Sequence, residues 1–147
     1  MPEKNNIYLV GPMAAGKSTI GKLLARRLNK AFYDTDAEII KGTGVEISLI
    51  FELEGEEGFR SRETDKLKLL SVLDGAVIAT GGGIVLSEEN RKVLTETGWV
   101  IYLQCSVEQQ LSRTKFDTKR PLLQIDNPRK KLEELMRLRA PIYESIA

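Results

Sequence analysis

The sequence predicts a three-layer α/β fold in which a parallel β-sheet is covered by helices on both faces. Short apolar runs that suit buried strands alternate with longer segments whose apolar residues recur at helical spacing. Such alternation produces parallel strands joined by helices. The chemically informative residues follow the predicted strands, and open α/β sheets bind ligands at the carboxyl ends of their strands. We therefore expect residues 1–147 to form a single domain with its site at that edge.

The first half of the chain contains three predicted strands and the helices between them. In order these are a strand at 7–10, a helix at 18–28, a strand that exits through 32–36, helical segments within 37–73 and a strand at 76–80. The apolar residues of the first helix fall on one stripe, formed by Ile20, Leu23, Leu24 and Leu28. Three consecutive glycines close the third strand.

The second half of the chain repeats the pattern. It is expected to contain a helix at 88–97 that ends at Gly98, a strand at 99–103, a helix that follows Ser106, a charged loop at 114–127 and a helix opened by Asn127-Pro128. Ser106 with Gln109 three residues later is typical of a capping box. Loop and helix boundaries thus carry recognisable signals.

Composition excludes several kinds of chemistry and several partners. The chain has 22 basic and 21 acidic residues, one cysteine and no histidine. A net charge of +1 disfavours binding to nucleic acid or to an anionic membrane. An internal disulfide, a cysteine zinc cluster and a histidine base are all excluded, so carboxylates, amines, guanidinium groups and hydroxyls must carry any reaction. The absence of an apolar spanning or leader segment predicts a cytoplasmic protein.

Residues 11–18, GPMAAGKS, match the phosphate-binding pattern G-x-x-x-x-G-K-[ST] between a predicted strand and a predicted helix. In such a loop, backbone N–H groups and the helix dipole face the phosphates, the lysine follows the transferred group, and the hydroxyl can bind Mg²⁺. We expect ATP to contact Ala14, Ala15, Gly16, Lys17, Ser18 and Thr19. Alanine at 14 and 15, where glycine is common, requires that the local φ stay negative.

Asp34 and Asp36 leave the second predicted strand at positions i and i+2, so both can face the phosphate site. One carboxylate could hold the water shell of Mg²⁺, and the other could orient or deprotonate an acceptor hydroxyl. The alternative is that they cap the helix that begins near Ala37.

These features together resemble the shikimate kinase family, small P-loop kinases that phosphorylate shikimate with ATP. The segments that carry the resemblance, in family order after the phosphate loop, are 33–36 YDTD, 55–60 GEEGFR, 80–83 TGGG, 119–123 KRPLL and 139–143 RAPIY. The resemblance implies the three-layer P-loop kinase fold, Mg²⁺ as cofactor, ATP as co-substrate and a monomeric enzyme that makes shikimate 3-phosphate.

The resemblance also implies roles for individual residues on the acceptor side. Asp36 looks like the residue that holds shikimate hydroxyls and acts as base, and Asp34 like a second-shell Mg²⁺ residue. Arg60 and Arg139 resemble the pair that grips the shikimate carboxylate, a task suited to guanidinium groups. Glu63, one helical turn after Arg60, could hold that arginine in place. Gly81, Gly82 and Gly83 can bring backbone N–H groups close to the substrate because no side chain blocks the approach.

Two segments look like the mobile parts of the family. Residues 37–62 resemble its substrate-binding segment, and about 113–127 its lid over ATP. Arg120 in the lid could neutralise charge on the transferred phosphoryl group. Arg113 is expected to bind ATP, with an ordinary charged surface position as the alternative.

The sequence departs from the family pattern at Ala147, where relatives continue into a further strand and helix. We therefore expect a sheet of four strands, with the strand at 99–103 left at an edge. Two other functions stay open from the sequence: a P-loop kinase for another carboxylated polyol such as gluconate, and an inactive nucleotide-binding module.

Overall fold

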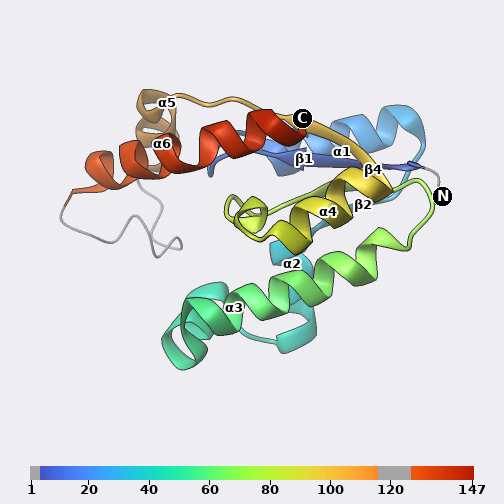
Figure 1. Cartoon of the computed structure of the whole chain (residues 1–147), viewed down its shortest axis with the longest axis horizontal. Helices are drawn as coiled ribbons and strands as arrows, with labels where there is room; N and C mark the ends of the chain where they lie inside the picture. Colours follow the sequence, from blue (N-terminus) through green and yellow to red (C-terminus); the bar gives the residue numbers. More distant parts are fainter. Residues whose placement is uncertain (1–3, 116–126) are drawn as a thin grey trace.

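The computed structural model describes residues 4–115 and 127–147 (Figure 1). Its elements, in chain order, are β1 (Asn6–Val10), α1 (Lys17–Leu28), β2 (Phe32–Asp34), α2 (Thr35–Thr43), α3 (Ile47–Ser71), β3 (Val77–Ala79), the 3-10 helix η1 (Ile84–Leu86), α4 (Glu88–Thr97), β4 (Gly98–Tyr102), α5 (Val107–Thr114) and α6 (Pro128–Ile146). The alternation of strands and helices predicted from the sequence is confirmed.

The four strands form one parallel sheet in the order β2-β3-β1-β4. Ile7 of β1 lies opposite Val77 of β3 on one side and Trp99 of β4 on the other. The two central strands are buried on both faces, which accounts for their continuous apolar sequences. Within the described sheet β4 is an edge strand, as expected, and Trp99 on it is 63% exposed.

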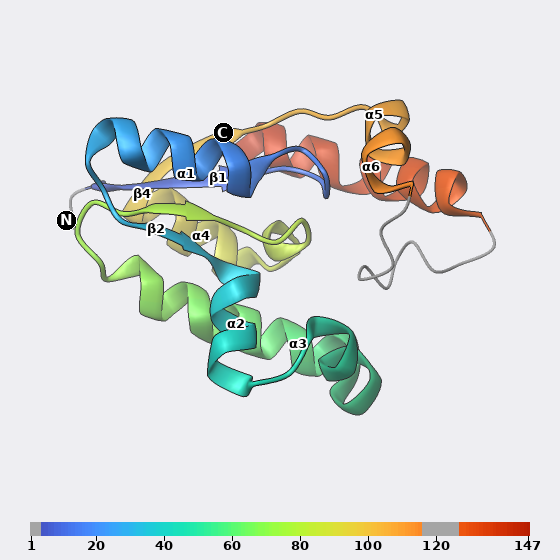
Figure 2. The ribbon, with the colours of Figure 1, turned by 180° about the vertical axis from the view of Figure 1, so that it is seen from behind.

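Helices cover both faces of the sheet, so the predicted three layers are present (Figures 1 and 2). Alternate residues of β1 point to opposite faces: Leu9 packs with Ala25 of α1, whereas Tyr8 and Val10 face the larger core. Helices α3, α4 and α6 line that larger core, whose buried residues are Tyr8, Val10, Leu67, Leu70, Ala76, Ile78, Ile84, Val85, Leu94 and Tyr143. Among the described helices, none combines the length and apolar character that crossing a bilayer requires.

Helix α1 forms as predicted, but its apolar stripe does not face the sheet. Ile20, Leu23 and Leu28 are 42–52% exposed, and the buried residues are Gly21 and Ala25. A Cβ on Gly21 would overlap the Phe32 ring. Close approach of the helix to the sheet therefore uses its small residues and leaves most of its leucine stripe outside.

Helix α2 and the first part of α3 form an outlying lobe below the sheet, whereas the rest of α3 packs on the larger core (Figure 2). Its small core consists of Ile39, Ile50 and Phe59, and the Phe51 and Phe59 rings lie 4.9 Å apart. Gly55 interrupts α3 with a φ of 74°, so the helix is two segments joined at a glycine. This lobe corresponds to the predicted segment 37–62.

Gly98 ends α4 as predicted, although for another reason. Its φ is −166°, extended backbone that any residue adopts, so conformational freedom is not what requires glycine. A Cβ at Gly98 would come within 2.6 Å of the Tyr8 ring and 2.5 Å of the Asn6 carbonyl oxygen. Glycine at this position lets β4 lie directly against β1.

Candidate functional site

The phosphate loop (residues 11–18) joins β1 to α1 through left-handed backbone. Gly11 has a φ of 148° and Gly16, the N-cap of α1, a φ of 90°. Ala14 has a φ of 65°, so the expectation that both alanines keep a negative φ is wrong at this position. The turn that points N–H groups inward requires the left-handed region at Ala14 even without glycine, at a cost of about 1 kcal/mol. Ala15 keeps a negative φ.

Lys17 lies folded over the phosphate loop. Its ammonium group donates to the carbonyl oxygens of Gly11 and Pro12, the latter at 3.1 Å. The charge is thereby placed at the mouth of the loop, where the phosphates of a bound nucleotide would lie. Thr19, the last of the predicted ATP contacts, is exposed on the first turn of α1.

Ser18 and Asp34 meet at the end of the loop, and Asp34 takes the helix-capping role that was the alternative considered from the sequence. The Ser18 hydroxyl donates to Asp34 Oδ2, and Asp34 Oδ1 accepts from the Ala37 N–H at 3.1 Å as the N-cap of α2. A hydroxyl beside a carboxylate is the hard oxygen set that suits Mg²⁺. Residues 4–115 and 127–147 contain no group of three converging acidic or cysteine side chains, so such an ion would rely on phosphates and water for its other ligands.

Asp36 and Glu63 meet across the glycine turn, which is formed by residues 81–83. A Cβ built on Gly81 would lie 2.9 Å from Glu63 Oε2 and 3.1 Å from Asp36 Oδ1. A larger residue at Gly81 would therefore displace one of the carboxylates. The turn lets its backbone come within reach of both α2, which carries Asp36, and α3, which carries Glu63.

Arg60 is held by Glu63, as expected from their spacing. Arg60 Nη1 donates to Glu63 Oε1 at 2.8 Å, and the guanidinium group occupies the space that a Cβ on Gly83 would need. Glu63 is fully buried, and this burial raises its pKa above 4.5; Asp36 raises it further, while Arg60 and Arg139 oppose the shift. Arg60 is thus fixed against the glycine turn and remains 26% exposed.

Arg139 approaches the same turn from α6 and is 8% exposed. Its Nη1 lies 3.6 Å from the position of a Cβ on Gly82, and the Gly11 carbonyl oxygen and the Met13 nitrogen lie at 3.5 and 3.6 Å from that position. The glycine turn therefore separates Arg139 from the phosphate loop by a single backbone layer. Asp36, Arg60 and Arg139 come from three different helices and converge on these three glycines.

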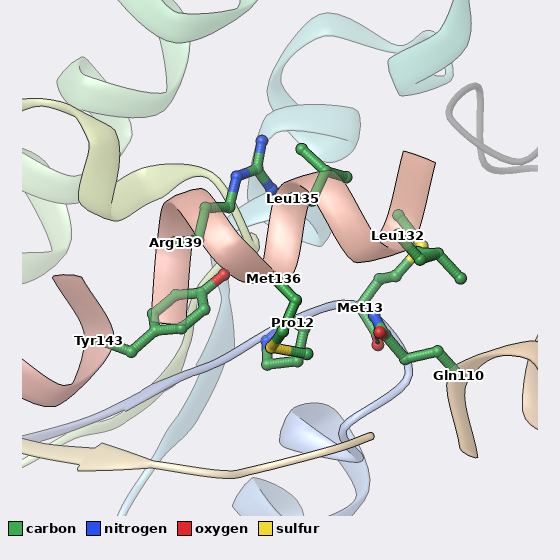
Figure 3. A pocket seen from close by; sticks show the side chains of 8 residues that line it. All are labelled: Pro12, Met13, Gln110, Leu132, Leu135, Met136, Arg139 and Tyr143. Atoms are coloured by element: carbon green, nitrogen blue, oxygen red, sulfur yellow. Dashed lines mark hydrogen bonds between the residues drawn. The ribbon is translucent and has the colours of Figure 1, made fainter. Parts of the chain in front are cut away.

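A small cavity of about 20 Å³, room for one water molecule, lies between the phosphate loop and α6 (Figure 3). Its lining residues are Pro12, Met13, Gln110, Leu132, Leu135, Met136, Arg139 and Tyr143. A wider, open pocket lies on the other side of the loop, beside Ser18 and Asp34.

Arg113 lies on α5 and contacts the phosphate loop from its outer side. Its Nη1 donates to the Ala14 carbonyl oxygen at 2.7 Å and lies 3.7 Å from the Cys105 sulfur. Gln110 on the same helix donates to the Met13 carbonyl oxygen at 3.1 Å. Arg120 and most of the predicted lid, 116–126, lie outside the described residues.

Four residues at the site had no predicted role: Thr35, Cys105, Gln110 and Tyr143. Thr35 and Tyr143 bond to the glycine turn, and Cys105 and Gln110 contact the phosphate loop. Tyr143 follows Arg139 by one helical turn in a segment that the sequence singles out, which is the signal that could have pointed to it. Thr35 likewise lies in the segment 33–36 that the sequence singles out, whereas Cys105 and Gln110 lie in none of those segments.

A parallel sheet in this strand order, with a phosphate loop after its first strand, defines the class of the protein as a P-loop kinase. A family model described as "Shikimate kinase" matches residues 13–147. The chain belongs to the shikimate kinase family.

Curated relatives carry the family name. A shikimate kinase of Methylococcus capsulatus is 55% identical over 147 residues, covering 100% of this chain and 82% of that protein. One of Haemophilus influenzae strain Rd is 57% identical over 148 residues, again covering 100% of this chain and 82% of the relative.

Solved structures agree. The shikimate kinase from Acinetobacter baumannii in complex with shikimate has a TM-score of 0.96 and 50% identity, over 98% of this chain and 80% of that one. The enzyme from Aquifex aeolicus has a TM-score of 0.84 and 40% identity, over 96% of this chain and 83% of that one.

Proposed function

We propose that this chain transfers the γ-phosphoryl group of ATP to the 3-hydroxyl of shikimate, giving shikimate 3-phosphate and ADP. The observation that carries the proposal is the convergence of Asp36, Arg60 and Arg139 on the glycine turn, one backbone layer from the phosphate loop. Two fixed guanidinium groups suit a carboxylate, and the nearby carboxylate suits a hydroxyl. An acceptor held between them would face the phosphates directly.

The residues divide the reaction as follows. The N–H groups of the phosphate loop and Lys17 hold the β- and γ-phosphates, and Arg60 and Arg139 orient the acceptor by its carboxylate. Asp36 orients the attacking hydroxyl and accepts its proton. Arg120, in the predicted lid, stabilises charge on the transferred group. Ser18, with Asp34 behind it, would hold Mg²⁺, which would supply positive charge to the phosphate oxygens.

We further propose that the enzyme acts as a monomer in the cytoplasm. We infer the cytoplasm because the proposed co-substrate, ATP, is available there. Cys105 is a buried free thiol, which suits a reducing environment.

ADP release in the presence of Mg²⁺ tests the proposal, with shikimate and gluconate compared as acceptors. We expect release that depends on shikimate and stops when EDTA removes the metal. ADP release with gluconate but not with shikimate would show that the acceptor is gluconate. If neither acceptor gives ADP release while ATP still binds, the chain would be an inactive nucleotide-binding module.

Asp36→Asn tests the assigned base. We expect a loss of turnover of at least about 100-fold, since general-base catalysis contributes about 10²–10⁴. ATP affinity, measured by calorimetry, should change less than about threefold. Full turnover in this variant would contradict the role of Asp36.

A further inference from the structure

The glycine turn lies against Asp36, Arg60 and Arg139, and hydroxyl groups from two separate helices bond to it. The turn begins after Thr80, whose hydroxyl and N–H both bond to the Leu9 carbonyl oxygen at the end of β1. Beyond this anchor the three glycines have no side chains with which to fix themselves. The N–H groups of Gly82 and Gly83 can face a ligand reproducibly only if neighbouring elements hold the backbone.

Thr35 holds the first glycine. Its hydroxyl accepts the Gly81 N–H at 3.1 Å, and the side chain is fully buried. Thr35 lies between the two aspartates, on the first residue of α2. The bond therefore links the turn to the N-terminus of α2, which also carries Asp36.

Tyr143 holds the second glycine. Its hydroxyl donates to the Gly82 carbonyl oxygen, and the residue is 1% exposed. Burial raises the pKa of Tyr143 to about 12, although Arg139 opposes the shift, so the hydroxyl remains a proton donor at neutral pH. Its ring packs on that of Tyr102 at 5.0 Å, so the ring has a packing role separate from that of the hydroxyl.

Tyr143 follows Arg139 by four residues on α6, so both side chains lie on one side of this helix and line the same small cavity (Figure 3). The bond to Gly82 therefore also fixes how far α6, and Arg139 with it, stands from the phosphate loop. Together the two hydroxyl bonds tie α2, the turn and α6 into one unit, and these are the elements that carry the base and one of the two arginines.

We propose that Thr35 and Tyr143 are positioning residues for the acceptor, which fix the glycine turn so that Asp36 and Arg139 address one bound shikimate molecule together. The inference rests on the proposed function. It concerns the acceptor alone, because the ATP phosphates are held by the phosphate loop, whose bonds are independent of these hydroxyls.

Tyr143→Phe tests this inference, because it removes the hydroxyl and keeps the ring on Tyr102. We expect KM for shikimate, and Kd for shikimate measured by calorimetry without ATP, to rise about tenfold, as loss of one buried hydrogen bond implies. KM for ATP should change less than twofold. The matched control, Tyr102→Phe, removes a hydroxyl from the same ring pair, leaves the bond to Gly82 intact and should leave both constants unchanged.

Thr35→Val provides a second, independent variant, since valine has the same shape without the acceptor oxygen. It should weaken shikimate binding in the same way, and Thr35→Ser, which restores the oxygen, should recover most of the affinity. A lower melting temperature with unchanged shikimate constants in both Tyr143→Phe and Thr35→Val would overturn the inference alone. A wild-type chain that binds no shikimate would overturn the proposed function, and the inference with it.

Discussion

Glu63 links the chemistry of the site to the stability of the fold. Its carboxylate is fully buried beneath the glycine turn, and burial raises its pKa above 4.5 despite the bond to Arg60. A carboxyl group with a raised folded pKa binds a proton more readily in the folded chain. Its contribution to the free energy of unfolding is therefore complete below pH 4.5 and is lost as pH rises through the raised folded value.

Glu63→Gln isolates this pH dependence. We expect the free energy of unfolding of the wild type, minus that of the variant, to fall as pH rises from 4 to 7, measured by urea unfolding at each pH. Glu54→Gln is the control with the opposite sign, because the hydrogen bond from Arg62 lowers the pKa of the exposed Glu54. If the free energy of unfolding of the wild type minus that of Glu63→Gln instead rises with pH, the proposed effect of burial on the pKa of Glu63 would be contradicted.

Ala14 carries the strain of the phosphate loop, since its φ is 65°. Ala14→Gly should stabilise the fold by about 1 kcal/mol, because glycine adopts this conformation without steric cost. Ala15→Gly, where φ is negative, should instead destabilise it by about 0.5–1 kcal/mol. Chemical unfolding of both variants checks the pair, and destabilisation by Ala14→Gly would contradict the assigned strain.

At the scale of elements, α5 holds the outer side of the phosphate loop. Arg113 and Gln110 bond to the carbonyl oxygens of Ala14 and Met13, which keeps these oxygens turned toward α5. The capping box at Ser106 and Gln109 begins this helix at a defined residue. The loop is therefore held in one conformation by a neighbouring helix as well as by its own glycines.

Arg113→Met should raise KM for ATP about tenfold and leave KM for shikimate within about twofold, because one charge-assisted hydrogen bond to the loop is lost. Steady-state kinetics with each substrate varied in turn measures both constants. Arg137→Met, which removes an exposed cation from α6, is the charge-matched control. Equal effects of the two variants would assign the change to net charge and contradict a local role for Arg113.

Much of the fold follows from local sequence, and what does not follow depends on distant residues. Strands β1, β3 and β4 were predictable because each contains a short apolar run, β2 because two aromatic residues precede the acidic pair, and the phosphate loop because its spacing is specific. The buried face of α1 was not, since close packing at Gly21 against Phe32 outweighs the leucine stripe.

The site shows the same division between local and distant signals. Its charged residues could be proposed from motifs, whereas the hydroxyl partners of the glycine turn lie 46 and 61 residues from it in sequence. No local pattern relates residues so far apart. The positive φ of Ala14 could not be predicted either, because the loop motif does not specify the backbone angle of each of its residues.

For the whole molecule, substrate binding should raise the free energy of unfolding. A ligand that binds only the folded chain, present at 100 times its Kd, raises the free energy of unfolding by about 2.7 kcal/mol. We expect shikimate to give this increase and gluconate, at the same concentration, to give none, as measured by thermal and urea unfolding. Equal stabilisation by both acids would contradict an acceptor site selective for shikimate.

The order of the strands also determines when the phosphate loop can form during synthesis. β1 pairs with β3 and β4, so Asn6 cannot pair with Gly98 until the ribosome has made that residue, about 90 residues later. At about 5–20 residues per second the ribosome takes roughly 5–20 s to make that stretch. Until β3 has been made the first strand has no partner, and until β4 has been made it is paired on one side only. The earliest part of the chain to be translated is thus among the last to become competent for binding.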